Sequence, residues 1–325
     1  MNSSLPNRTV LLALITIQLL FGLNYIFSKI IMEHIPPLIW GSIRCASTAF
    51  ILASIAITLR KFDPKKAGQN WRPLLLFSLL GIVLNQGCFL LGLHRTTPTN
   101  SALLNTLIPI FTVLVVSLRG VEKFTPLKIL GFATAFSGVL ILQHVENLNF
   151  GSETFVGDLL TISNALFYSL FLGFSQDFFS KNDFTWSTTW LFIFGTPGFF
   201  TFAGYDLATF QWTSLPLLVV LAAIANVLLG TVSPYLLISF TLSKTSSSLV
   251  ALFVYVQPLV ASILAYFFFG HVVTGRTLLS GVLIFSGVFL VLLRKNRRQN
   301  QPILEETEQV FDNVIPIRSA GGKKR

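Results

Sequence analysis

Apolar stretches long enough to cross a membrane recur along this chain, and they constrain its fold more than any other feature. The first begins at Val10, the last ends at Leu293, and short polar segments separate them. A bilayer core roughly 30 Å thick needs about 20 consecutive apolar residues for each helix that crosses it. The pattern therefore predicts an all-α integral membrane protein whose main solvent is lipid.

Breaks at proline, glycine and charged residues divide these stretches into ten predicted transmembrane helices. The predicted spans lie near residues 10–32, 38–59, 74–94, 98–118, 126–143, 157–179, 186–205, 215–240, 247–269 and 274–293. In the seventh span, the segment Gly195-Thr196-Pro197-Gly198 is expected to kink or break the helix. A membrane tolerates such a break where neighbouring helices satisfy the freed backbone groups.

The composition excludes several other classes of protein. Charged residues make up only 11% of the chain, compared with about 25% in a typical soluble domain. The formal net charge is +10, but the basic residues gather beside helix ends as topology signals do, so we expect no nucleic-acid partner. Cys45 and Cys88 lie inside apolar stretches, which predicts buried thiols rather than a disulfide or a metal site.

Basic residues are distributed unequally between alternate loops, which predicts the orientation. One side of the bundle receives Arg8, the clusters at 60–72 and 119–128, Lys181, Lys244 and the basic start of the tail, whereas the other receives Arg95 and Arg276. Basic residues accumulate on the cytoplasmic side of a membrane. We therefore expect a multi-pass protein of the cell membrane with residues 1–9 and a largely disordered tail, 294–325, in the cytoplasm.

The two halves of the chain share a pattern. Asn105-Thr-Leu-Ile-Pro109 and Phe136-Ser-Gly-Val139 are echoed by Val254-Tyr-Val-Gln-Pro258 and Phe285-Ser-Gly-Val288, each 149 positions later. A repeat of five helices, an odd number, must enter the membrane upside down in its second copy. This inverted-repeat plan is typical of secondary transporters, and it predicts two five-helix units at 10–143 and 157–293.

Several motifs in both halves follow the pattern of a known family. Phe21-Gly22-Leu23-Asn24-Tyr25-Ile26-Phe27-Ser28-Lys29 is similar to a Trp-Gly-x-x-Phe-x-x-x-Lys opening, with Phe21 in place of the usual Trp, and Arg44 follows in the second helix. Gly120-Val121-Glu122-Lys123-Phe124-Thr125 is similar to a Gly-Glu-x-hydroxyl turn with one extra residue, whereas the second half has Gly270-His271 there. Gly157-Asp158-Leu159-Leu160 is similar to a second-repeat start. Together these motifs resemble the EamA-like branch of the drug/metabolite transporter superfamily.

The resemblance implies a ten-helix carrier with a central cavity that moves amino acids, related metabolites or amphipathic compounds, often outward. It does not identify the substrate. It implies a small-molecule substrate and membrane lipids as partners, leaves a homodimer open, and implies no cofactor.

Polar residues at membrane depth are the candidates for contact with a solute. A side-chain amide that faces lipid loses its hydrogen bonds, so each must face another helix or a water-filled path. Hydrogen bonding between helices, typically worth about 0.6 kcal/mol per bond, is the alternative role for each residue. The candidates nearest the midplane are Asn85, Gln86, Asn226, Tyr255 and Gln257, and further candidates are Asn24, Tyr25, Asn105, Asn164, Tyr168 and Trp190.

Lys29 and Arg44 are the basic residues inside the predicted spans. Both fall in the outer third, where a long side chain can reach the headgroups. Because the first two helices are antiparallel neighbours, the alternative is a positive mouth that attracts a carboxylate or a phosphate.

Pro109 and Pro258 occupy matching positions of the repeat near the midplane. Each frees a carbonyl one turn earlier, so the pair predicts two hinges, with static kinks as the alternative.

The leading hypothesis is a secondary carrier, an exporter of small metabolites, that works by alternating access around a midplane cavity. A membrane-embedded enzyme acting on lipids and a scaffold without transport are the alternatives. The sequence has no phosphate-binding loop, and its four histidines lie at loops or helix ends without a catalytic motif. We therefore expect no catalytic residues.

Overall fold

The computed structural model describes residues 7–96, 98–122, 125–142, 155–212, 214–257, 259–260 and 275–297. All regular secondary structure in these ranges is helical. Within the described residues, six helical segments are long and apolar enough to cross a membrane, and three apolar helices are shorter. The prediction of an all-α membrane protein with many membrane-capable helices is thereby confirmed.

The described part of the first half contains nine helical segments, and all except the short α3 follow the first five predicted spans closely. They are α1 (Arg8–Met32), α2 (Pro37–Thr58), α3 (Pro64–Gln69), α4 (Trp71–Ser78), the π-helical η1 (Leu79–Leu84), α5 (Asn85–Arg95), α6 (Pro98–Asn105) and α7 (Leu107–Leu118), followed by α8 (Pro126–Leu142). The second half contains α9 (Phe155–Lys181), α10 (Phe184–Thr209), α11 (Leu217–Val227), the π-helical η3 (Leu228–Val232), α12 (Ser233–Lys244), α13 (Ser247–Leu252), the 3₁₀ segment η4 (Phe253–Val256) and α15 (Gly275–Arg297).

Two aspartates start helices by capping free backbone amides. The Asp63 carboxylate accepts a hydrogen bond from the backbone amide of Lys66 at 3.0 Å and begins α3, a short helix that the apolar pattern does not predict. Asp183 accepts from the backbone amides of Thr185 and Trp186 and begins α10. Both side chains satisfy donors that a helix start leaves unpaired.

Helix α10 passes through Pro197 without interruption, so the expected break in the seventh span does not occur. Its glycines serve close packing instead. A Cβ atom on Gly195 would lie 3.0 Å from the Ile82 side chain, and one on Gly198 would lie 2.8 Å from the Val83 side chain. Small residues let helices approach closely in membranes, where packing drives association.

Two π-helical segments occur at matching places in the two halves. Segment η1 begins at Leu79 and η3 begins at Leu228, 149 residues later, and both carry the sequence Leu-Leu-Gly. A π-helical turn disturbs the regular ladder of backbone hydrogen bonds and is frequent at functional sites. Here a side chain satisfies a carbonyl within η1, because the Tyr235 hydroxyl donates to the Gly81 oxygen at 2.9 Å.

A second pair of distortions lies near the predicted hinges. The fourth predicted span is interrupted at Thr106, between α6 and α7, three residues before Pro109. At the matching position of the second half, Tyr255 lies within η4. Pro258 lies outside the described residues, and hinge motion at either proline stays a prediction.

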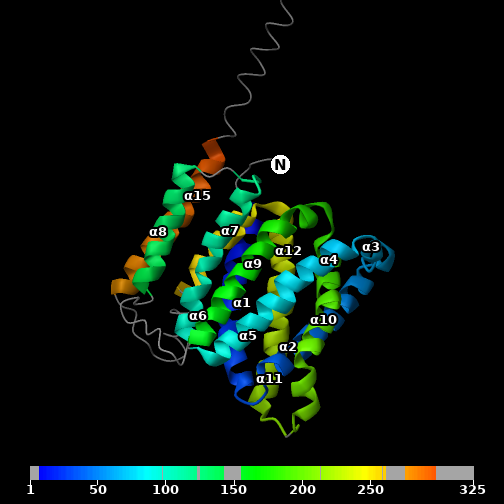
Figure 1. Cartoon of the computed structure of the whole chain (residues 1–325). Coiled ribbons are helices and arrows are strands. Elements are labelled where there is room, and N and C mark those ends of the chain that lie inside the picture. Colours follow the sequence, from blue (N-terminus) through cyan, green and yellow to red (C-terminus); the bar gives the residue numbers. More distant parts are fainter. Residues whose placement is uncertain are drawn as a thin grey trace, which may run out of the picture.

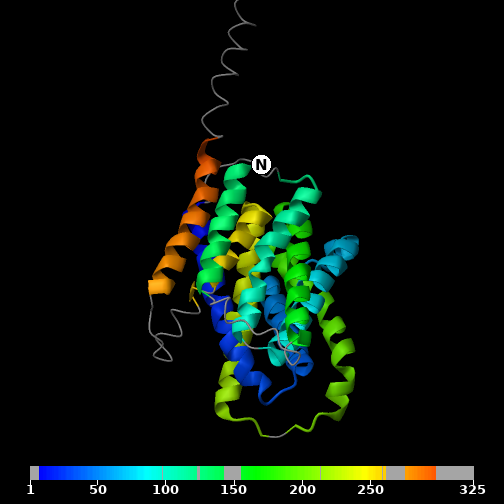
Figure 2. The ribbon, with the colours of Figure 1, turned by 60° about the vertical axis from the view of Figure 1, so that its left-hand side comes forward.

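Helices α8 and α15 lie side by side at one edge of the bundle in both views (Figures 1 and 2). A Cβ atom on Gly287 would lie 2.5 Å from the Gly131 oxygen, and one on Gly138 would lie 2.9 Å from the Ser280 oxygen. This pairing makes the two helices antiparallel. In the second half, residues 280 and 287 are the repeat counterparts of residues 131 and 138. The contact between residues 131 and 287 is therefore the repeat counterpart of the contact between residues 280 and 138.

Figure 1 places the start of α1 and the end of α15 at the same end of the bundle. Helices α2, α7, α9 and α12 also end there, and they bring Lys61, Arg119, Lys181 and Lys244 to it. We call this the basic end.

Candidate functional site

A cavity lies among α1, α2, α5, α6, α7, α9, η3, α12 and η4, and it offers about 70 Å³ to the centres of water-sized molecules. Helices from both halves of the chain contribute to its wall, which combines amide, phenol and aromatic side chains. Among its described lining residues, one, Arg44, carries a formal charge, and none is acidic. The lining residues are Phe21, Asn24, Tyr25, Arg44, Asn85, Gln86, Phe89, Asn105, Ile108, Asn164, Tyr168, Gly230, Tyr235, Val254 and Gln257.

Arg44 is only 2% exposed and is held by amide oxygens from three other helical segments. Its Nη1 donates to Asn24 Oδ1 at 3.4 Å and to Asn226 Oδ1 at 3.5 Å, and its Nη2 donates to Gln86 Oε1. The guanidinium therefore lies in the cavity wall, deep within the bundle, and does not extend to the headgroups. Such a buried position does not fit a snorkelling side chain, and Lys29 does not line the cavity with Arg44, so the two residues do not form one positive mouth.

Asn226 lies behind this wall and orients Asn24. Its Nδ2 donates to Asn24 Oδ1 at 2.9 Å, and its side chain is fully buried. A Cβ atom on Gly230, one turn later, would lie 2.9 Å from the same Asn24 oxygen. A larger residue would force the Asn24 side chain to shift, so Gly230 lets the backbone of η3 lie against the α1 amide.

Asn85 and Asn164 join α5 to α9 by a reciprocal pair of hydrogen bonds. Asn164 Nδ2 donates to the Asn85 backbone oxygen at 2.8 Å, and Asn85 Nδ2 donates to the Asn164 backbone oxygen at 3.3 Å. The Tyr235 hydroxyl lies 3.3 Å from Asn85 Oδ1. These bonds fix the rotation of both helices and turn the two amides towards the cavity.

On another part of the wall, Asn105 Nδ2 donates to the Tyr25 hydroxyl. Tyr25 also packs edge-to-face on Phe89, with ring centroids 5.3 Å apart. Three buried polar atoms of the lining have no hydrogen-bond partner among the described residues: Arg44 Nε, Gln86 Nε2 and Asn105 Oδ1. The first two are donors and the third is an acceptor.

Most of the residues expected to contact a solute meet at this cavity. Asn24, Arg44, Asn85, Gln86, Asn105, Tyr168 and Gln257 line it, and so do Tyr25 and Asn164. Asn226 supports the wall from behind. Tyr235 was not among the predicted residues, although it occupies the repeat position of Gln86, 149 residues later.

Besides Asn226, three of the expected residues do not line the cavity. Lys29 is half-buried and makes no hydrogen bond or ion pair within the described part of the chain. Tyr255 is buried against Phe136 of α8, with ring centroids 6.0 Å apart. Trp190 stacks on Phe62 near the basic end.

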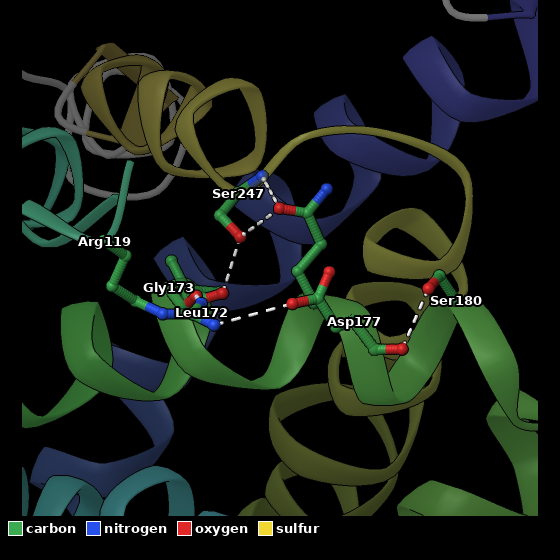
Figure 3. A network of polar contacts seen from close by, with 7 residues as sticks. Arg119, Leu172, Gly173, Asp177, Ser180 and Ser247 are labelled. Atoms are coloured by element: carbon green, nitrogen blue, oxygen red, sulfur yellow. Dashed lines mark hydrogen bonds and ion pairs between the residues drawn. The ribbon is translucent and has the colours of Figure 1, made fainter. Parts of the chain in front are cut away.

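A second polar network lies between the cavity and the basic end, and we call it the latch; Figure 3 shows the part of it around Arg119 and Ser247. It consists of Arg119, Glu122, Gln176, Ser247 and Ser248, which join α7, α9 and the start of α13. Gln176 Oε1 accepts from the Ser247 amide at 3.2 Å and from its hydroxyl at 3.0 Å. Gln176 Nε2 donates to the Thr245 oxygen at 3.0 Å.

The rest of the latch adds contacts on either side. The Ser247 hydroxyl donates to the Leu172 oxygen at 2.6 Å, and the Ser248 hydroxyl donates to Glu122 Oε2 at 2.7 Å. Arg119 donates to the Gly173 oxygen and forms a 3.5 Å ion pair with Asp177. The start of α13 is thereby tied to both α7 and α9.

Comparison with known proteins follows the same division of the chain. The EamA-like transporter family matches it twice, at residues 8–143 and 155–293. The chain belongs to the EamA-like transporter family. The resemblance in its motifs is thus confirmed, and so is its place among multi-pass membrane transporters.

Two of the relatives are named as uncharacterized transporters, and a third is named as a WAT1-related protein. An uncharacterized transporter of Archaeoglobus fulgidus is 26% identical over 300 residues, covering 90% of this chain and 99% of the relative. The uncharacterized transporter YoaV of Bacillus subtilis is 22% identical over 89% and 99%. The WAT1-related protein At3g53210 of Arabidopsis thaliana is 22% identical over 96% and 93%. A protein crystal structure shares the fold, with a TM-score of 0.73 and 16% identity over 90% of this chain and 99% of that one.

Proposed function

We propose that this EamA-like protein is a secondary transporter that exports small metabolites, such as amino acids or amphipathic compounds. The observation that carries the proposal is the buried polar cavity, whose described wall contains residues of both halves and three buried polar atoms without a hydrogen-bond partner. A polar cavity at membrane depth is expensive to maintain in a protein that only packs its helices together. A transport site gives these residues a role.

The mechanism that we propose is alternating access of two inverted five-helix repeats. Three features support inversion: the antiparallel α8 and α15, their exchanged glycine contacts, and the π-helical segments at the same offset in each half. Inverted repeats can exchange conformations with each other, which moves the opening from one membrane face to the other.

The latch supports a gate at the basic end. Along α9, Tyr168 lines the cavity, while Leu172 and Gln176 lie about 6 and 12 Å further towards the basic end at the usual helical rise. Opening that end requires α9 to separate from the α12–α13 connection, which breaks the Gln176 bonds. With the basic end in the cytoplasm, as the loop charges favour, the described conformation is closed towards the cytoplasm.

Reconstitution in liposomes tests the proposal. Purified protein should catalyse counterflow of at least one solute from a mixture of amino acids, monocarboxylates and cationic dyes. Asn85→Leu removes an amide that lines the cavity and the bond that it donates to the Asn164 backbone oxygen, and it should abolish that flux. Ser163→Ala is the matched control on α9, because Ser163 is half-buried, does not line the cavity and donates its hydroxyl to the Leu159 oxygen of its own helix. Absence of counterflow for every solute would refute the proposal.

A further inference from the structure

We infer that the cavity selects a small monocarboxylate with an apolar body, whose carboxylate binds Arg44 and Gln86. The inference rests on the proposed transport function and names the chemical class of its solute. Three features of the cavity support it: the charge of the cavity, its hydrogen-bonding atoms without partners among the described residues, and its apolar surface.

The charge of the described lining is uncompensated. Arg44 is surrounded by three neutral amide oxygens, and the cavity has no acidic lining residue. Amide dipoles satisfy its hydrogen bonds but supply no negative charge. A buried cation without a counter-ion is costly in a medium of low polarity. A bound anion supplies the missing charge, whereas an organic cation adds repulsion.

The free donors match the two oxygens of a carboxylate. A guanidinium has no acceptor, so the Gln86 oxygen must face Arg44 and its Nε2 must face elsewhere. Gln86 Nε2 and Arg44 Nε are both buried, and neither has a partner among the described residues. The two atoms belong to side chains that hydrogen-bond each other, and a charged N–H beside a neutral one binds a carboxylate strongly once both side chains turn towards it.

The number of charges favours a monoanion. One guanidinium neutralises one negative charge, so a phosphate dianion would leave a second charge at membrane depth. Charged groups there are costly unless they are paired. The cavity therefore suits a carboxylate better than a phosphate.

The remaining wall suits an apolar body. Phe21, Phe89, Ile108 and Val254 contribute aromatic and aliphatic surface to the lining. Asn105 Oδ1 is a buried acceptor with no partner in the described part of the chain. It can accept a hydrogen bond from an N–H or O–H group carried by the solute.

Three molecules of matched shape test the inference on the purified wild-type protein. Phenylacetate should bind at least about tenfold more tightly than phenylacetamide, which is a free-energy difference of about 1.4 kcal/mol. Phenethylamine should bind more weakly than either of them. Binding is measured by calorimetry and transport by counterflow in liposomes. Equal or tighter binding of the amide or the amine would overturn the inference. If the amide or the amine were transported under these conditions, the proposed transport function would stand and only the inferred preference for a carboxylate would fall. If no solute at all gave counterflow, both would fall.

Variants assign the preference to Arg44. Arg44→Gln should weaken phenylacetate binding about tenfold or more and leave phenylacetamide within about twofold. Arg44→Lys should keep a preference for the carboxylate. The matched control is Arg8→Gln at the exposed start of α1, which should change neither ligand.

If Arg44→Gln does not fold, Gln86→Glu offers an independent test. It keeps the shape of the side chain and places a carboxylate beside the guanidinium. It should abolish the preference for phenylacetate over phenylacetamide. A preference that survives Gln86→Glu would overturn the inference.

Discussion

Gln176 offers a quantitative test of the latch. Its side chain is 5% exposed and makes three hydrogen bonds to the connection between α12 and α13, two with Ser247 and one with the Thr245 oxygen. Gln176→Ala removes all three from the closed conformation. Because opening the basic end breaks these bonds anyway, the substitution should destabilise the closed state selectively.

The expected size of the effect follows from the energy of hydrogen bonds in membrane proteins. Three bonds at about 0.6 kcal/mol each amount to about 1.8 kcal/mol. A free-energy difference of about 1.4 kcal/mol changes an equilibrium tenfold. Gln176→Ala should therefore raise the population open at the basic end roughly 20-fold, as long as that state is rare in the wild type.

Labelling of a cysteine in the cavity measures this population. Ile108→Cys places a thiol in the lining, in a background where Cys45 and Cys88 are replaced by alanine. A membrane-impermeant maleimide is applied to each face of the bilayer in turn. A separate cysteine at Lys65, which is exposed near the basic end, identifies the two faces.

The labelling rate from the basic end should rise roughly 20-fold in Gln176→Ala, and the rate from the opposite end should not rise. The matched control is Asn182→Ala, because the Asn182 amide donates to the Phe178 oxygen of its own helix. A rise below about threefold, or an equal rise in both variants, would refute the role of the latch as a gate.

Two further predictions concern stability. Gly287→Ala places a Cβ atom 2.5 Å from the Gly131 oxygen, so it should destabilise the fold by about 1–3 kcal/mol. Gly281→Ala is the control, because its new Cβ atom makes an ordinary contact at 3.7 Å. The melting temperature of this control in detergent should not fall. Equal melting temperatures for the two variants would contradict the described α8–α15 contact. Burial raises the pKa of Asp183, but the hydrogen bond from Lys61 and those from backbone amides outweigh it and hold the pKa below its usual value. The stabilisation by Asp183 is then present above the unfolded pKa of about 3.9 and is lost as the pH falls through the lower folded pKa. Asp183→Asn should therefore flatten the fall in melting temperature between pH 5 and 3. An unchanged slope of melting temperature against pH would contradict this.

The predicted spans agree with the helices to within a few residues in most cases, because the need to cover about 30 Å of hydrocarbon acts on each segment separately. The first span was predicted at 10–32 and α1 runs from Arg8 to Met32. The internal distortions were harder to predict. The repeated Leu-Leu-Gly was a usable signal for η1 and η3, and Pro109 was a signal for the break at Thr106.

The candidate site was predicted in part, because sequence position gives depth but not rotation about the helix axis. Lys29 and Arg44 have similar predicted depths, yet Arg44 lies in the cavity wall while Lys29 is half-buried away from it. Asn85 and Tyr255 likewise lie near a midplane, yet only Asn85 lines the cavity. The latch could not be predicted, because its bonds join residues from three separate segments.

By itself, the sequence determined the solvent of this protein, its helical class, its spans, its duplicated halves and its family, since each of these depends on composition or spacing along one chain. Tertiary structure decided which polar side chains share a cavity and which satisfy one another between helices. The physical reason is that in lipid every buried polar group needs a partner. The partner of Arg44 on α2 can be an amide on α1, α5 or α11, and only packing of the helices selects among them.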